Sequence, residues 1–176
     1  DISSAIYHAN IIRELQEVNT HRSELLEDLA EKNQQLSRTM AELWGEMELA
    51  RKIQTSILPR DCEVPGYEIT ACMHPADKVG GDYYDILRLS EDRTAVVVAD
   101  VSGKGASAAL LMASCKSMLT AHLEVGLPIE HRVGRLNSYV LANSTSEKFL
   151  TLFHAEVDPQ RDRLRYCNGG HNPPIL

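Results

Sequence analysis

The sequence predicts an α+β protein in which a long N-terminal helix, forming a parallel coiled coil, precedes an antiparallel sheet with segregated helices. Apolar residues recur at the heptad spacing of about 3.5 residues over residues 12–57. Farther along, runs rich in β-forming residues flank a pair of segments with helical periodicity. We therefore expect a coiled-coil linker and dimerisation helix over residues 1–58 and a globular domain over residues 59–176.

The first third of the chain has the pattern of a coiled coil. From Ile12 to Ile57 it contains no proline and a single glycine, Gly45. With Ile12 at position a, the seam residues are Ile12, Asn19, Leu26, Asn33, Met40, Met47 and Gln54 at a, and Leu15, Arg22, Leu29, Leu36, Leu43, Ala50 and Ile57 at d. Asparagine at position a fixes the register of a parallel two-stranded seam, so we expect a parallel homodimer. The alternative is an amphipathic helix packed on its own domain. Pro59 is expected to end the helix.

The rest of the chain is expected to form strands, then two helices, then strands. Strands are predicted at residues 67–73, 82–89, 94–99, 149–157 and 163–168, and helices at residues 106–124 and 129–143. The first three strands suggest an antiparallel meander. Residues 158–162, with the sequence DPQRD, are typical of a turn. This order of elements is typical of a layered α+β domain.

Composition excludes some partners and compartments. The net charge of -7 and the aromatic content of 5% disfavour nucleic-acid binding. No apolar run approaches the roughly 20 residues that span a bilayer, and no signal peptide precedes the helix. We expect a cytoplasmic protein, with membrane attachment of a further N-terminal part left open, because the chain begins with Asp1 rather than Met. The cysteines, which lack any Cys-x-x-Cys pair, are expected to be free thiols: Cys62, Cys72, Cys115 and Cys167.

Two glycine-rich segments each carry a carboxylate at a strand end. Asp82 follows Gly80 and Gly81, and Asp100 follows the apolar run at residues 94–99. Acidic side chains at neighbouring strand ends suit a hard divalent cation, which prefers oxygen ligands. Two such cations about 4 Å apart can clamp a phosphate and activate a water. The alternatives are a tight turn with a capping aspartate and a turn that leads into a helix.

Other motifs are weaker or absent. The segment around Lys104 is not a phosphate loop. Val98 stands where the motif needs its first glycine, and Gly105 follows the lysine where the motif needs serine or threonine. A nucleotide-binding ATPase is therefore not supported. His171, within GGHNPP, either carries a proton near a site or lies in a rigid turn. The histidines show no spacing typical of a zinc site.

Four segments in order, residues 48–59, 80–85, 100–105 and 168–174, carry a family resemblance. Together they resemble the bacterial, SpoIIE/RsbU-like branch of the PPM-type metal-dependent serine/threonine phosphatases, over about residues 46–176. The resemblance implies an α/β/β/α sandwich that holds two Mn²⁺ or Mg²⁺ ions between its sheets. By motif, it implies that Asp82 and Asp100 are catalytic metal ligands and that Val101 contributes its backbone carbonyl.

The resemblance also implies a function. Similar proteins dephosphorylate serine or threonine of STAS-type anti-anti-sigma proteins by two-metal water attack, without a covalent intermediate. An upstream sensor domain in the parent protein is expected to act through the helical linker. We hypothesise that coil geometry positions the junction helix and thereby orders the loop that bears Asp100.

The chain departs from the family beyond Pro174, where further metal-binding carboxylates are expected. Residues 59–176 would then be the N-terminal two-thirds of the phosphatase domain. This departure leaves an alternative open, a catalytically inactive dimeric signalling or scaffold module. Metal-dependent phosphate release distinguishes the two.

Overall fold

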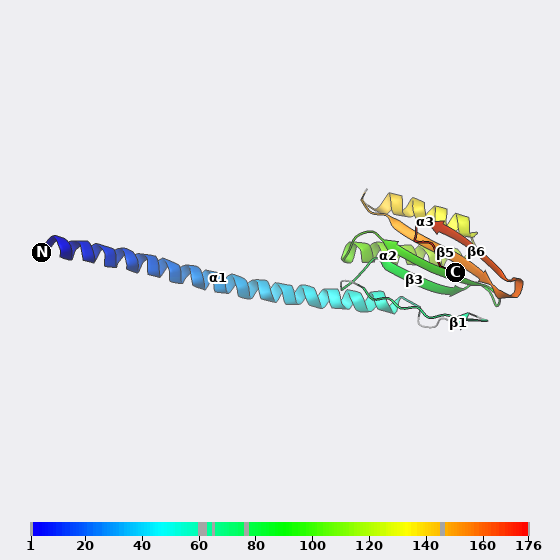
Figure 1. The fold of residues 1–176 in the computed structure, drawn as a ribbon, viewed down its shortest axis with the longest axis horizontal. Coiled ribbons are helices and arrows are strands. Elements are labelled where there is room, and N and C mark those ends of the chain that lie inside the picture. Colours follow the sequence, from blue (N-terminus) through cyan, green and yellow to red (C-terminus); the bar gives the residue numbers. More distant parts are fainter. Residues whose placement is uncertain (1, 60–62, 65, 76–77, 145–146, 176) are drawn as a thin grey trace. The chain divides into compact units, whose positions relative to one another are not determined.

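The computed structural model describes residues 2–59, 63–64, 66–75, 78–144 and 147–175. The chain divides into two compact units, Asp1–Glu46 and Met47–Leu176. The first unit is helical throughout its described residues, and the second contains the sheet and the other helices (Figure 1). The predicted domain boundary between residues 58 and 59 stays a prediction.

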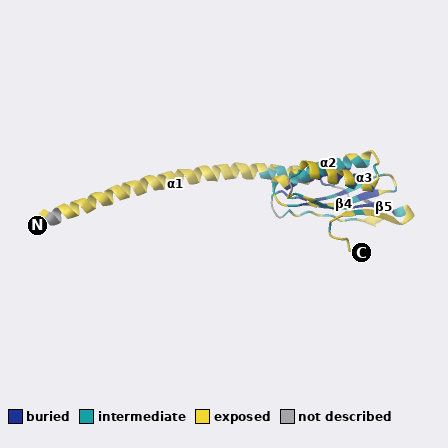
Figure 2. Cartoon of the chain, turned by 90° about the horizontal axis from the view of Figure 1, so that it is seen from above, coloured by how far each residue is buried: buried dark blue, intermediate teal, exposed yellow. Residues whose placement is uncertain are grey.

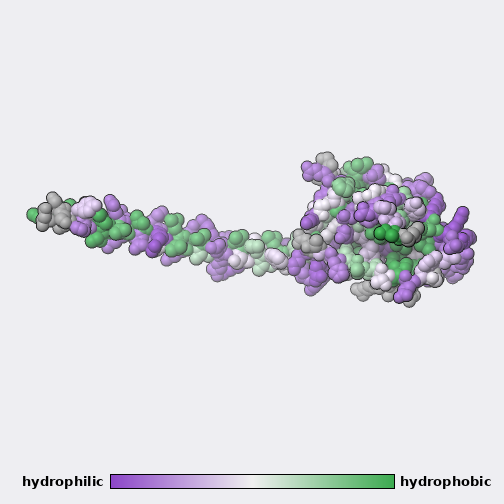
Figure 3. Space-filling view, viewed as in Figure 1, coloured by the Kyte–Doolittle hydropathy of each residue, from purple (hydrophilic) through white to green (hydrophobic). Residues whose placement is uncertain are grey.

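Helix α1 spans Ile2–Ser56 and ends just before Pro59, as predicted. In the first unit its apolar heptad residues are exposed: Ile12, Leu15, Leu26, Leu29, Leu36, Met40 and Leu43. Figure 2 colours almost this entire part of the helix as exposed, and Figure 3 shows apolar and polar residues interspersed along it. A helix with an exposed apolar stripe gains stability when a partner helix buries that stripe. The pairing of two such helices stays a prediction.

Four antiparallel strands form the main sheet in the order β3-β4-β5-β6. Their bounds are Asp82–Arg88, Thr94–Val101, Leu150–Asp158 and Arg163–Gly169. Helices α2, Ala106–Glu124, and α3, Ile129–Asn143, lie between β4 and β5 in sequence, with the predicted bounds. The turn between β5 and β6 contains a short 3₁₀ helix, Pro159–Arg161, which begins where the Asp158 side chain accepts a hydrogen bond from the Arg161 backbone.

The predicted strand at residues 67–73 is wrong, and so is the three-stranded meander built on it. Only β2, Tyr67–Glu68, is a strand, and it pairs with β1, Glu63–Val64, in a separate small sheet. Gly66, directly before β2, has a φ of 84°. Met73 instead packs its side chain against the core from a segment without strand structure. Loose alternation therefore reflected a segment that half-buries alternate side chains without forming a strand.

The helices cover one face of the main sheet. Helix α2 packs on β3 and β4, and α3 packs on β5 and β6. Because side chains alternate along a strand, Val97, Ala99 and Val101 of β4 point into this core. Figure 2 shows the buried residues concentrated in β4 and β5. The opposite face of the sheet carries Asp82 and Asp100.

Buried charges also link the helices to the sheet. Lys116 of α2 reaches Asp85 of β3 at 2.5 Å. Arg132 of α3 pairs with Glu156 of β5 and donates to Nε2 of His154. Burial, reinforced by the Arg132 charge, lowers the pKa of His154 to about 4, so this imidazole is neutral near pH 7.

Two composition-based expectations concern cysteines and membranes. Cys72, Cys115 and Cys167 are free, and Cys62 lies outside the described residues. Among the described residues, no helix is both long enough and apolar enough to cross a membrane.

Candidate metal centre

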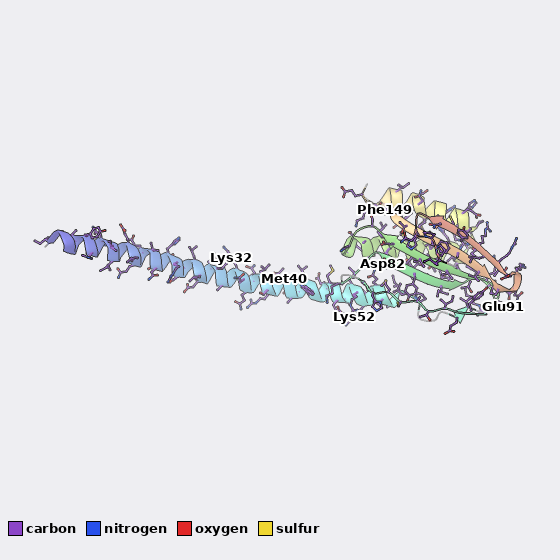
Figure 4. The ribbon with its side chains drawn as sticks, in the orientation of Figure 1. Lys32, Met40, Lys52, Asp82, Glu91 and Phe149 are labelled. Atoms are coloured by element: carbon purple, nitrogen blue, oxygen red, sulfur yellow. The ribbon has the colours of Figure 1, made fainter. Side chains whose placement is uncertain are left out.

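Asp82 and Asp100 face each other across β3 and β4. They are direct partners in the antiparallel register, which places their Cβ atoms about 5 Å apart on one face of the sheet. Both are exposed. Figure 4 labels Asp82 near one end of the sheet and Glu91 near the other. Asp100 lies inside β4 rather than after it, because that strand continues to Val101, two residues beyond the predicted end.

The electrostatics of this pair favour a cation. Partial burial and the neighbouring Asp82 charge raise the pKa of Asp100, while His171 acts in the opposite direction. Neither carboxylate forms an ion pair with a basic side chain within the described part of the chain. A divalent cation would relieve their repulsion, and their oxygens are the ligands that Mn²⁺ and Mg²⁺ accept. Within the described ranges, no group of three or more His, Cys, Asp or Glu side chains gathers as a metal site.

The third predicted ligand, the Val101 carbonyl, lies against Gly81. The Val101 backbone N–H donates to the Gly81 oxygen at 3.2 Å. A Cβ atom at Gly81 would overlap with the Val101 carbonyl oxygen and lie 3.0 Å from Val101 Cβ. Glycine thus permits the close approach of two backbones directly before Asp82. The Asp82 and Asp100 carboxylates lie side by side, and the role of the Val101 carbonyl as a third metal ligand stays a prediction.

Replacing Gly81 by alanine is expected to destabilise the globular unit by about 1–3 kcal/mol, because the methyl group forces the two strands apart. We also expect weaker Mn²⁺ binding, since the Asp82 side of the site moves. Thermal unfolding and calorimetric titration of Mn²⁺ measure both effects. Gly134→Ala is the matched control, because an added Cβ there meets nothing within 4 Å. Equal effects of the two substitutions would contradict this explanation.

The segment after Asp100 is tied to the beginning of β5. The Ser102 backbone N–H donates to the Phe149 carbonyl at 2.9 Å, and the Phe149 N–H donates to Ser102 Oγ at 2.9 Å. Lys148 Nζ donates to the Ser102 carbonyl at 2.9 Å. These contacts hold the connection between β4 and α2. Lys148 carries no signal in the sequence, because nothing local connects it with residue 102.

The segment before Asp82 is held by the end of α1. The Gln54 amide donates to the Gly80 carbonyl at 2.6 Å, and its oxygen accepts from the Gly80 N–H at 3.2 Å. Gln54 is 5% exposed. It was assigned to the coiled-coil seam, as was Ile57, which packs against the core of the second unit. Gln54 is polar at a heptad position where an apolar residue is expected. This was the one sign in the sequence that its partner is not a second helix.

His171 lies near the pair through a neighbouring strand. Thr151 of β5 is the register partner of Asp100, on the strand next to β4. Its hydroxyl lies 2.8 Å from His171 Nδ1. Asn168 fixes the intervening turn, because its side chain accepts from the His171 N–H at 2.8 Å and donates to the His171 carbonyl at 3.0 Å. The rigid turn, one of the two alternatives weighed from sequence, is present, whereas a proton-carrying role of His171 stays a prediction.

Comparison with known proteins assigns the family. Residues 90–176 match the family described as Stage II sporulation protein E (SpoIIE). The phosphoserine phosphatase RsbU of Bacillus subtilis is 31% identical over 146 residues, which cover 81% of this chain and 43% of RsbU. Residues 90–176 of this chain belong to the SpoIIE family. A further relative, the phosphoserine phosphatase RsbP of Bacillus subtilis, is 29% identical over 135 residues, which cover 74% of this chain and 33% of RsbP.

The fold of this SpoIIE-type chain also matches a solved structure. The SiaA-PP2C domain of Pseudomonas aeruginosa superposes with a TM-score of 0.61 at 19% identity, covering 74% of this chain and 55% of that one. This likeness confirms the mixed α+β, PP2C-type fold expected from the sequence. The chain spans less than half the length of the curated relatives RsbU and RsbP.

Proposed function

We propose that this chain is part of a regulated, metal-dependent protein serine/threonine phosphatase. Its substrate would be a phosphorylated STAS-type anti-anti-sigma protein or a similar phosphoprotein. The chain's similarity to two phosphoserine phosphatases supports the reaction class. The observation that carries the proposal is the register that sets Asp82 directly opposite Asp100 on one face of the sheet.

In this proposal the chain's own residues would bind the metal and set its position. Asp82, Asp100 and the Val101 carbonyl would hold Mn²⁺ or Mg²⁺, with two ions in the complete centre. When bound, such ions supply Lewis-acid chemistry that neutralises phosphate charge and lowers the pKa of water. Gly81 allows the backbones to approach, and the Ser102 contacts with residues 148 and 149 hold the following segment in place.

The proposal is tested by phosphate release from a phosphoserine STAS-type protein, using the full-length protein that contains this chain. We expect release that requires Mn²⁺ or Mg²⁺ and stops when EDTA is added. Unphosphorylated substrate and a metal-free reaction are the controls. Absence of release with either metal would instead favour the inactive dimeric scaffold.

We further propose that the helix controls this site as a parallel homodimer. The exposed heptad residues of the first unit support dimer formation, with a second copy of the chain as the partner. Within the second unit, the last turns of α1 reach the segment before Asp82 through Gln54 and Gly80. A change in helix position at Gln54 would therefore move the backbone next to a proposed metal ligand.

Replacing Met40 by proline is expected to separate the coil from the phosphatase activity. Proline inside a helix removes a hydrogen bond and costs about 3 kcal/mol or more. We expect a shift from dimer to monomer in sedimentation measurements and loss of regulation by the upstream sensor. Met40→Leu keeps an apolar seam residue and is the control. A Met40→Pro protein with unchanged dimerisation and unchanged regulation would rule out control through the coil.

A further inference from the structure

His171 has one ring nitrogen held by a hydrogen bond and one that forms none with a described residue, although the ring also acts electrostatically on Asp100. Nδ1 lies 2.8 Å from the Thr151 hydroxyl. None of the hydrogen bonds between described residues involves Nε2, and the residue is only partly buried. A histidine whose role is solely to stabilise a fold gains most by using both nitrogens or by packing its ring in the core. His171 does neither.

The backbone around His171 sets the position of the ring. Gly170 has a φ of 78° and forms an isolated bridge with Leu152 of β5. Asn168 then closes the turn through its two hydrogen bonds to the His171 backbone. Because the backbone and Nδ1 are both held, the free nitrogen has a defined position before any ligand binds. Such preorganisation lowers the entropic cost of binding.

The environment of the ring indicates what the free nitrogen would bind. Thr151, which holds Nδ1, is the cross-strand partner of Asp100, and Asp100 is the partner of Asp82. The ring therefore lies beside a row of polar residues on three adjacent strands. Cations held by the two carboxylates would bring a phosphate to this row. Phosphate oxygens accept hydrogen bonds and therefore need donors around them. The two carboxylates cannot donate while ionised, so the donor has to come from another residue.

We propose that His171 binds an oxygen of the substrate phosphate through Nε2–H, with Thr151 positioning the ring by its contact with Nδ1. This inference rests on the proposed phosphatase function and adds a residue to its substrate site. The histidine acts as a hydrogen-bond donor. The Thr151 hydroxyl donates to Nδ1 and so keeps the proton on Nε2.

Two amide substitutions distinguish the contribution of Nε2 from that of Nδ1. The Gln side chain places an amide nitrogen near the position of histidine Nε2, whereas the shorter Asn side chain reaches only the position of Nδ1. In the full-length, Mn²⁺-loaded protein, we expect His171→Asn to weaken binding of inorganic phosphate about 10- to 100-fold, the usual effect of losing a hydrogen bond to a charged group. His171→Gln is expected to stay within about threefold of the wild type, because the donor remains. Titration calorimetry measures both, and the KM for phosphoprotein should rise in parallel.

The position of the ring is tested through Thr151. Thr151→Val keeps the shape of the side chain but removes the hydroxyl, so phosphate binding should weaken. Thr151→Ser keeps the hydroxyl and should bind phosphate nearly as the wild type does. Mn²⁺ affinity and thermal stability are expected to remain unchanged in His171→Asn.

Several outcomes would overturn the inference. Phosphate binding by His171→Asn equal to wild type would do so, as would failure of His171→Gln to retain binding. Parallel losses of Mn²⁺ affinity or stability in His171→Asn would assign a structural role instead. If the wild-type protein neither binds nor releases phosphate with metal, the proposed function fails as well. An active wild type with an unaffected His171→Asn variant removes only the inference.

Discussion

Replacing Asp100 by asparagine is expected to reduce Mn²⁺-dependent phosphate release by about 10³-fold, since metal ions contribute several kcal/mol to such reactions. The same change should leave the fold intact or slightly stabilise it. Asp100 is exposed and faces Asp82 directly, so removing one charge relieves repulsion between them. Phosphate release, Mn²⁺ titration and thermal unfolding together reveal this combination of lost activity with retained stability.

Asp82→Asn should give the same combination of effects, because the two carboxylates share one site. Asp162→Asn is the matched control, as this exposed aspartate lies in the hairpin turn with a φ of 48°, a conformation that asparagine also accepts. Full activity in Asp100→Asn would refute the assignment of the site. A large loss of stability would instead make Asp100 a structural residue.

Replacing Lys116 by methionine is expected to lower the free energy of unfolding of the globular unit by about 3–5 kcal/mol, the usual cost of leaving a buried charge without its partner. Asp85 is 1% exposed and accepts from Lys116 Nζ at 2.5 Å. The Tyr83 hydroxyl, at 2.7 Å, and the Ile86 N–H, at 3.1 Å, also donate to this carboxylate. Those two neutral donors would remain, but no described cation would replace the ammonium group.

Denaturant unfolding tests this expectation. Arg165→Met is the control, because the Arg165 pair with Glu130 is exposed, and such pairs contribute about 0–1 kcal/mol. The double variant Asp85→Asn/Lys116→Met removes both charges and should recover most of the lost stability, since the asparagine oxygen can still accept from the Ile86 N–H while its amide NH2 donates to the Tyr83 hydroxyl oxygen. A double variant as unstable as Lys116→Met alone would show that the loss comes from packing.

The two aspartates of the Gly-Gly-Asp-Tyr-Tyr-Asp segment therefore differ in role. Strand alternation has a period of two, so Asp82 and Asp85, three residues apart, lie on opposite faces. Asp82 faces Asp100, and Asp85 faces helix α2. The strand period of two places the two aspartates on opposite faces of the sheet. Only the tertiary structure shows which of these faces the helices cover.

Local sequence determined much of this protein. The heptad pattern predicted helix α1, and apolar periodicity predicted α2, α3 and the strands β3 to β6, because those signals depend on residues close together in the chain. The carboxylates were found because glycines and aspartates adjoin apolar strands. The strand at residues 67–73 was predicted wrongly, because an extended segment and a paired strand bury side chains with the same alternation.

Only the tertiary structure showed the contacts between distant segments. Gln54 with Gly80, Lys148 with Ser102, Lys116 with Asp85 and Thr151 with His171 join residues that no periodic pattern connects. Each is a polar contact whose partner depends on strand register and on how helices pack on the sheet. Short-range propensity fixes the elements, whereas the arrangement of buried polar groups depends on chain packing, and that arrangement positions the candidate site.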